Sequence, residues 1–291
     1  FVLPLPPGHR FPMAKYRRLR ERLTQERVVP EGWMRVPDGV SDTDLQRAHL
    51  PAYVRAVAEG RLSAAEQRRI GFPWSPGMVE RSRRSAGATL AACRAALAHG
   101  TGVNLAGGTH HAFAGRGEGY CVFNDAAVAV RVLQAEGAVG RVLVVDTDVH
   151  QGNGTAALFR GDDSVFTLDL YGERNFPFEK EPCDLGRPLP DGTGDARYLE
   201  VLDTALADAQ SRSEPDLVVY VSGADPYEGD RLGRLALSKA GLAERDRVVF
   251  AACRRAGLPV AVTMAGGYAA DIEDTVDIHV ATVREALTAG I

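Results

Sequence analysis

The chain has 291 residues and a formal net charge of −4, from 34 Lys and Arg against 38 Asp and Glu. It has no basic excess and no apolar run long enough to cross a bilayer, so we expect neither nucleic acid nor a membrane as a partner. Hydrophobic residues make up 45% and charged residues 25%, as in ordinary globular domains. No repeat or composition shift divides residues 1–291, which we expect to form one domain.

Residue usage also bears on compartment and source. The four cysteines lack the spacing of paired cysteines, so we expect a reducing compartment, the cytoplasm. Lysine occurs only at Lys15, Lys180 and Lys239, and arginine supplies the other basic residues. We interpret this bias as the codon usage of a G+C-rich, bacterial genome.

Helical and extended patterns alternate along the chain, which favours a parallel sheet covered by helices on both faces, a three-layer α/β/α architecture. Apolar periodicity predicts helices over residues 13–23, 51–59, 77–98, 125–136, 198–211, 239–256 and 271–286. Apolar runs without polar alternation predict buried strands over residues 103–106, 141–145, 217–221 and 260–264. Residues 171–194 are rich in Pro and Gly and predict a long surface loop that walls a site.

Chemically active residues follow each predicted strand directly. They are His110 and His111 after the first, Asp146, Asp148 and His150 after the second, Asp225 after the third and Tyr268 after the fourth. Ligands bind at the carboxyl ends of parallel strands, so these residues are expected to meet. Alternate residues of an extended chain share a face, which brings Asp146, Asp148 and His150 together. Carboxylates with an imidazole suit a first-row divalent metal.

Four motifs in this order resemble the histone deacetylase superfamily. The paired-His motif is Gly107-Gly108-Thr109-His110-His111, followed by residues 119–125, and the metal-binding motif is Asp146-x-Asp148-x-His150-Gln151-Gly152-Asn153-Gly154. Gly223-Ala224-Asp225 with residues 228–233 is similar to the third-ligand motif, and Gly266-Gly267-Tyr268 to the motif of the catalytic tyrosine. The resemblance runs from about residue 104 to residue 268 and implies the arginase/deacetylase-like fold with a mainly parallel central sheet.

Two positions depart from the commoner family pattern. Gln151 and Asn153 stand where most members carry His and Asp, and this version resembles the class IV branch. Residues 167–171 and 228–233 resemble that branch as well. Asn cannot carry charge, so His111 is expected to be less basic here than beside an Asp.

The resemblance implies a role for each site residue. Asp148, His150 and Asp225 are expected to bind one zinc per chain, with His111 as general base and acid and His110 as its electrostatic partner. Asp146 would orient His110, Asn153 would orient His111, and Tyr268 would donate a hydrogen bond to the developing oxyanion. Gly119 and Tyr120 would form one wall of a substrate tunnel, whose opposite wall the sequence does not name. A structural potassium or sodium ion is expected near Asp146, with further oxygens from residues 167–170.

The expected function is zinc-dependent hydrolysis of the lysine side-chain amide, which removes acetyl or longer fatty acyl groups. The partner would be an acyl-lysine protein or peptide; the alternative is a small acylated amine such as an acetylpolyamine. A binuclear, arginase-like ureohydrolase and a non-catalytic scaffold are less favoured, and the oligomeric state stays open. The residues also have structural interpretations: Asp146 and Asp148 as caps of the next helix, Asp225 as a turn former, and Tyr268 as the start of the last helix.

Overall fold

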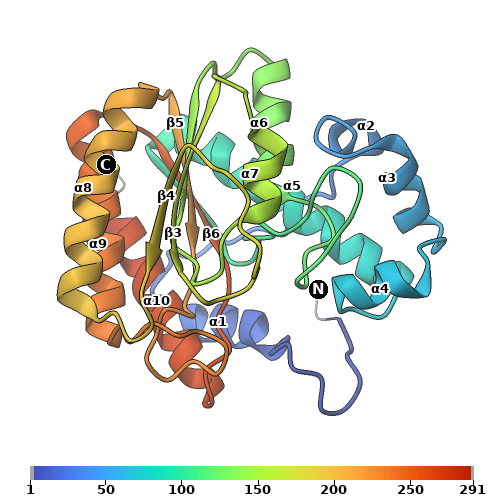
Figure 1. Cartoon of the computed structure of the whole chain (residues 1–291), viewed down its shortest axis with the longest axis horizontal. Coiled ribbons are helices and arrows are strands. Elements are labelled where there is room, and N and C mark those ends of the chain that lie inside the picture. Colours follow the sequence, from blue (N-terminus) through green and yellow to red (C-terminus); the bar gives the residue numbers. More distant parts are fainter. Residues whose placement is uncertain (1–2, 290–291) are drawn as a thin grey trace.

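A parallel sheet forms the centre of the computed structural model, which describes residues 3–289; residues 1–2 and 290–291 lie outside the described part (Figure 1). Its six strands have the order β1-β6-β5-β2-β3-β4, and every neighbouring pair is parallel. The strands are β1 Thr101–Asn104, β2 Val142–Asp146, β3 Val165–Gly172, β4 Leu185–Leu189, β5 Leu217–Ser222 and β6 Val260–Met264. The predicted α/β class with a parallel sheet is confirmed.

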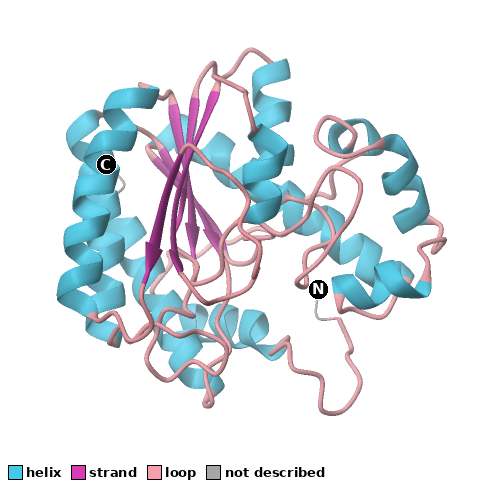
Figure 2. Ribbon diagram, viewed as in Figure 1, coloured by secondary structure: helices cyan, strands magenta, loops and turns pink. Residues whose placement is uncertain are grey.

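Helices cover both faces of the sheet (Figure 2). They are α1 Ala14–Gln25, α2 Asp42–Leu45, α3 Pro51–Ala58, α4 Ala64–Ile70, α5 Pro76–His99, α6 Asp125–Ala135, α7 Asn153–Phe159, α8 Asp195–Ser213, α9 Lys239–Ala256 and α10 Ile272–Ala289. Helices α8 and α9 lie on one side and α5 and α6 on the other, while α2 to α4 stand outside α5 (Figure 1). Among the described residues, no helix is both long and apolar enough to cross a membrane.

The β2 strand shows why these runs lack polar alternation. Val142 and Val144 pack into the core beneath α5 and α6, whereas Leu143 and Val145 pack into the core beneath α8 and α9. Successive side chains of a strand point to opposite faces, so a strand between two helical layers needs apolar residues at every position.

Three expectations about elements were wrong or incomplete. Strand β3, Val165–Gly172, was not among the predicted strands. The predicted loop over residues 171–194 contains β4, which pairs with β3 at the edge of the sheet. Its sequence, Leu-Gly-Arg-Pro-Leu, hides the strand, because an edge strand tolerates proline and needs few apolar residues. The short helices α2, α4 and α7 were also absent from the predicted set, since four to seven residues show too little periodicity.

A buried arginine of α9, paired with its neighbour Asp246, is hydrogen-bonded to the end of β5. Arg245 Nη2 lies 2.8 Å from Asp246 Oδ1 and donates to Ser222 Oγ at 2.8 Å, and Nη1 donates to the carbonyl of Gly223. Both charged side chains are fully buried. The contact fixes the backbone just before Asp225, so the packing of α9 positions the carboxyl edge of the sheet.

Candidate active site

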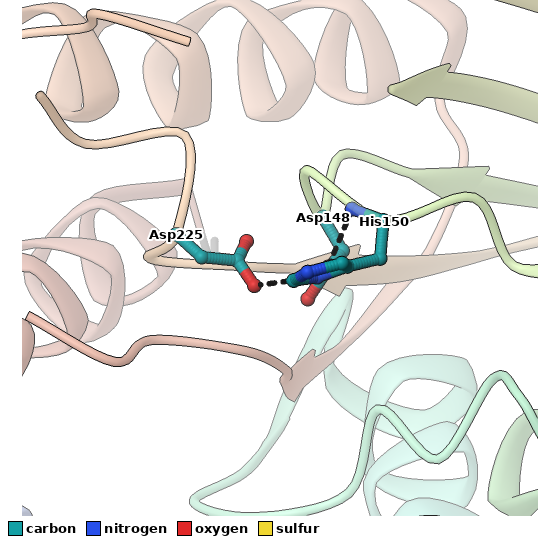
Figure 3. A group of neighbouring side chains, drawn as sticks. All are labelled: Asp148, His150 and Asp225. Carbon is teal, nitrogen blue, oxygen red and sulfur yellow. Dashed lines mark hydrogen bonds and ion pairs between the residues drawn. The ribbon is translucent and has the colours of Figure 1, made fainter. Parts of the chain in front are cut away.

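Three buried side chains meet at the carboxyl ends of β2 and β5, which are neighbours in the sheet (Figure 3). Asp148 and His150 follow β2, and Asp225 follows β5. Their ligand atoms all lie within 4.8 Å of one another. His150 Nδ1 is 2.9 Å from Asp148 Oδ1 and 3.1 Å from Asp225 Oδ2. Two carboxylates and one imidazole form a donor set that fits a zinc-like divalent cation.

Glycines let the backbone close around these carboxylates. A Cβ at Gly266 would lie 1.8 Å from Asp225 Oδ2 and 2.6 Å from Asp148 Oδ2, so no side chain fits there. The Gly266 amide donates to Asp148 Oδ2 at 2.7 Å, and the Val149 amide donates to Asp225 Oδ1 at 2.9 Å. The carboxylates are therefore held by backbone amides from two loops, those after β2 and β6, before any cation binds.

The charges of this cluster are strongly coupled. Burial alone would lower the pKa of His150, but its hydrogen bonds to Asp148 and Asp225 outweigh burial and raise that pKa to about 10. Burial and the nearby Asp148 raise the pKa of Asp225. Without a metal, a proton on His150 balances the two carboxylates. A metal cation that binds here must displace this proton, so metal binding is expected to release it.

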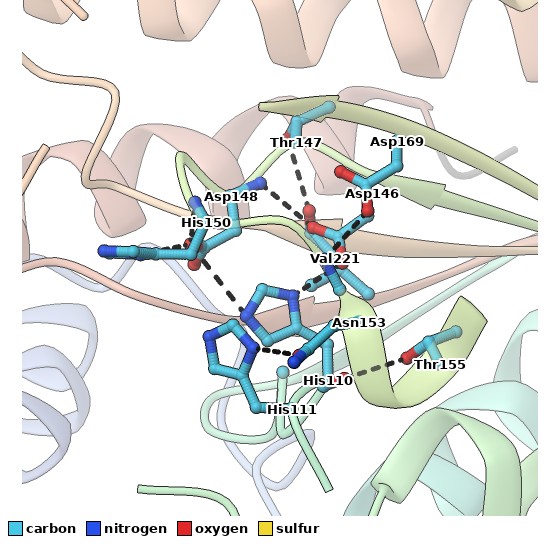
Figure 4. A network of polar contacts seen from close by, with 12 residues as sticks. His110, His111, Asp146, Thr147, Asp148, His150, Asn153, Thr155, Asp169 and Val221 are labelled. Atoms are coloured by element: carbon cyan, nitrogen blue, oxygen red, sulfur yellow. Dashed lines mark hydrogen bonds and ion pairs between the residues drawn. The ribbon is translucent and has the colours of Figure 1, made fainter. Parts of the chain in front are cut away.

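A pair of histidines lies beside the cluster (Figure 4). The rings of His110 and His111 are 4.1 Å apart between centroids. His110 Nδ1 is 2.6 Å from Asp146 Oδ2, and His111 Nδ1 is 2.7 Å from Asn153 Oδ1. The structure thus places Asp146 and Asn153 beside the histidines to which the family resemblance assigned them.

The two histidines differ in charge. Burial opposes protonation of His110, yet the carboxylates of Asp146 and Asp148 raise its pKa to about 9. Burial and the positive charges of His110 and His150 hold the pKa of His111 well below its usual value. Neighbouring groups with separated pKa values are characteristic of acid–base sites. At neutral pH, His111 is neutral and able to accept a proton.

Tyr268 follows β6, and its ring lies edge-on to His150 at 6.2 Å. Burial and the charges of Asp225 and Asp148 raise the pKa of its phenol well above the usual value. The phenol therefore keeps its proton and is available as a donor. The loop is anchored by the buried Lys15, whose Nζ donates to the carbonyl of Ala265 at 2.8 Å.

These groups surround a small pocket of about 30 Å³. Its lining includes seven of the predicted site residues, His110, His111, Gly119, Tyr120, Asp148, His150 and Tyr268. Asp146, Asn153 and Asp225 are buried behind this lining and contact the side chains that form it. A Cβ at Gly119 would lie 2.6 Å from His111 Cδ2, which explains why glycine stands beside the histidine.

Sequence reasoning missed four lining or neighbouring residues. The pocket is also lined by Phe11 from the segment before α1, Tyr16 from α1 and Arg81 from α5, and no motif spacing marked them. Phe176 stands at 5.0 Å from His111, edge to face, in the segment expected to wall the site. Its position in residues 171–194 was the available signal, but nothing selected it among its neighbours.

A second, smaller cavity of about 10 Å³ lies beside Asp146 and Asp169. Asp169 Oδ2 accepts from the Gly152 amide at 2.8 Å, and its Oδ1 has no hydrogen-bond partner among the described residues. Burial and the charge of Asp146 raise the pKa of Asp169 well above its usual value. Two adjacent buried carboxylates fit a monovalent cation. Residues 167–170 were expected to supply further oxygens to this cation. The hydroxyl of Thr167 donates a hydrogen bond to Asp184 Oδ2 at 2.7 Å.

The structure contradicts two of the structural interpretations of the motif residues: the helix caps and the helix start. Helix α7 has Gly152 as its N-cap residue and no side-chain cap, so neither Asp146 nor Asp148 caps it. Helix α10 begins at Ile272, beyond Tyr268. Asp146 and Asp148 instead lie beside His110 and His150 (Figure 4), and Tyr268 lines the pocket.

Comparison with known proteins identifies the family of the chain. The family model of the histone deacetylase domain matches residues 9–283. An uncharacterized protein of Picosynechococcus sp. is 45% identical over 279 residues, which are 96% of this chain and 93% of that protein. The histone deacetylase-like amidohydrolase of Pseudomonas aeruginosa is 33% identical over 283 residues, 91% of this chain and 74% of that protein.

Solved structures with a similar fold come from the same family. The crystal structure of a histone deacetylase homologue from Aquifex aeolicus superposes with a TM-score of 0.82, at 24% identity, over 97% of this chain and 80% of that one. The chain belongs to the histone deacetylase family, a family of amide hydrolases.

The metal-binding prediction is tested by removing one carboxylate at a time. Asp148→Ala and Asp225→Ala should each leave the purified protein without bound zinc, because two remaining ligands hold the ion poorly. Elemental analysis of the purified variants measures this loss. Asp203→Ala, an exposed aspartate on α8, is the matched control and should keep its metal. Full zinc content in either site variant would remove that residue from the ligand set.

Proposed function

We propose that this protein is a zinc-dependent hydrolase that removes acyl groups from the lysine side-chain amide. The observation that carries the proposal is the convergence of three metal-ligand side chains, a neutral buried histidine and a protonated tyrosine on one pocket. Three protein ligands leave a position for water and the substrate carbonyl, as in catalytic zinc sites. One zinc per chain is the stoichiometry that this donor set supports.

The residues divide the chemistry between them. Asp148, His150 and Asp225 would hold the zinc ion, which when bound would polarise the amide carbonyl and lower the pKa of water. His111 accepts the proton of the attacking water, because its imidazole is neutral at neutral pH. His110, held protonated by Asp146 and Asp148, supplies positive charge beside it. Tyr268 donates its hydroxyl to the oxygen that becomes negative. His111 then returns a proton to the leaving amine.

Two rival functions have less support. A binuclear ureohydrolase needs a second set of ligands, whereas the described residues offer one group of three, Asp148, His150 and Asp225. A non-catalytic scaffold would have no need to keep His110, His111 and Tyr268 together around a pocket.

The size of the pocket supports a short acyl group. A volume of about 30 Å³ is room for roughly two ordered waters. Acetyl fits this space better than a fatty chain, on lysine in a protein or peptide or on a small amine. The class IV resemblance at Gln151 and Asn153 makes fatty acyl groups the competing substrates, and these would need the pocket to open.

Several finer expectations remain part of the proposal. A potassium or sodium ion fits the cavity beside Asp146 and Asp169.

The four free cysteines suit a reducing compartment, and we propose the cytoplasm. We also propose that residues 1–291 act as one catalytic domain of bacterial origin.

The role of Tyr268 can be separated from metal binding. Tyr268→Phe removes only the hydroxyl, so zinc content and folding should be unchanged while kcat falls by roughly 10²–10³. Steady-state kinetics on an acetyl-lysine peptide, with elemental analysis of the same sample, measures both. Tyr171→Phe, a buried tyrosine of β3 outside the pocket lining, serves as control. A near-normal kcat for Tyr268→Phe would assign the oxyanion to another donor.

Acyl preference follows from the pocket. We expect kcat/KM for an acetyl-lysine peptide to exceed that for the same peptide carrying myristoyl-lysine. If the pocket opened to receive it, the longer chain would gain about 0.8 kcal/mol for each buried CH₂, and the order would reverse. An acetylated polyamine measured in parallel separates a lysine deacylase from an enzyme of small amines. Faster turnover of myristoyl-lysine would refute the short-acyl proposal and leave the hydrolytic mechanism intact.

A further inference from the structure

Asn153 is hydrogen-bonded on both sides of its amide. Its Oδ1 is 2.7 Å from His111 Nδ1, and its Nδ2 donates to Glu118 Oε1 at 2.8 Å. Glu118 belongs to the loop between β1 and α6, directly before Gly119 and Tyr120, and its side chain is only 14% exposed. A chain of three side chains, Glu118–Asn153–His111, thus leads from a carboxylate to the proposed general base.

The chemistry of these groups fixes the direction of each hydrogen bond. A carboxylate only accepts hydrogen bonds, so the Asn153 amide must turn its NH₂ group toward Glu118. Its carbonyl oxygen then faces His111 and also only accepts. His111 Nδ1 must therefore carry the hydrogen, and a neutral imidazole with its proton on Nδ1 has its lone pair on Nε2.

The opposite orientation of the amide would disable the base. If Asn153 turned its NH₂ group toward His111, Nδ1 would have to accept and Nε2 would carry the hydrogen. A histidine in that tautomer cannot take a proton through Nε2. Asn by itself does not fix the orientation of its amide, because the carbonyl oxygen and the NH₂ group are nearly equal in size and either can face His111.

We propose that Glu118 is a positioning residue that orients the Asn153 amide and thereby sets the tautomer of His111. This deepens the proposed function, on which the catalytic consequence rests, while the tautomer itself can be measured independently. The carboxylate acts across a neutral amide, so it selects the tautomer without placing a negative charge against the imidazole.

The other contacts of Glu118 are weak by comparison. Arg116 Nε lies 3.4 Å from Glu118 Oε2, and the Arg116 side chain is 42% exposed. The Arg116 guanidinium also stacks on the Phe113 ring, 3.5 Å from its centroid. The short contact of this carboxylate is the one to Asn153.

The first experiment reads the tautomer directly. In the zinc-loaded protein with ¹⁵N-labelled histidine, we expect His111 to show a protonated Nδ1 and an unprotonated Nε2. Glu118→Gln offers either a donor or an acceptor to Asn153, so the two tautomers should mix and the His111 signals should shift. Arg116→Gln removes the weak partner and should leave the signals unchanged. An unprotonated Nδ1 in the unaltered protein, or an unmoved spectrum in Glu118→Gln, would overturn the proposal.

The second experiment uses kinetics in two backgrounds. In the unaltered protein, Glu118→Gln should lower kcat by about twofold if both orientations are equally populated, and by up to roughly 10² if the wrong one dominates. KM and zinc content should not change. In the Asn153→Asp background a carboxylate faces His111 directly and repels Glu118, so Glu118→Gln should raise kcat there.

The sign of the effect separates positioning from a merely structural role. A loop anchor would make Glu118→Gln harmful in both backgrounds, and that result would refute the proposal. If the unaltered protein hydrolyses no acyl-lysine substrate, the proposed function fails, and the ¹⁵N spectrum still decides the role of Glu118.

Discussion

The site depends on holding two carboxylates, Asp148 and Asp225, side by side in the protein interior. Like charges repel strongly where water is excluded, so the pair is stable only with positive charge between or beside it. In the protein without metal, protonated His150 supplies that charge. A divalent cation can replace the proton, because backbone amides of Val149 and Gly266 already fix the oxygens. The fold therefore prepares the geometry, and in the proposed function a cation would complete the balance of charge.

The pairing of buried negative charges with positive charges extends to the residues around the cluster. Buried positive groups stand against the buried carboxylates: His110 against Asp146, and Arg245 against Asp246. The parallel sheet makes this possible, because the carboxyl ends of β2, β5, β6 and β1 deliver their loops to one edge. His111 is the exception, since burial beside positive neighbours keeps it neutral. In the proposed mechanism, this exception is the base, and its orientation depends on the uncharged Asn153.

The meeting of Asp146, Asp148 and His150 was predictable because strand periodicity makes it visible, whereas the roles of the histidines came from the family resemblance. Asp146, Asp148 and His150 alternate directly after an apolar run, and parallel strands bring Asp225 and Tyr268 to the same edge. Contacts between distant segments left no such mark: Phe11 and Arg81 reach the pocket from the N-terminal third, and Phe176 was one of many loop residues. Glu118 lies beside the predicted Gly119, yet only the structure shows that its carboxylate turns inward to Asn153. Strand β4 was hidden by the polar composition that sheet edges allow.

The central claim is that Asp148, His150 and Asp225 form one metal centre at which an amide is hydrolysed. It is tested most directly by titrating metal-free protein with Zn²⁺ while following hydrolysis of an acetyl-lysine peptide and bound metal in the same samples. Activity should rise from zero and reach its plateau at one bound zinc per chain. A plateau that requires two metals per chain, or full occupancy without hydrolysis of any acyl-lysine substrate, would contradict it.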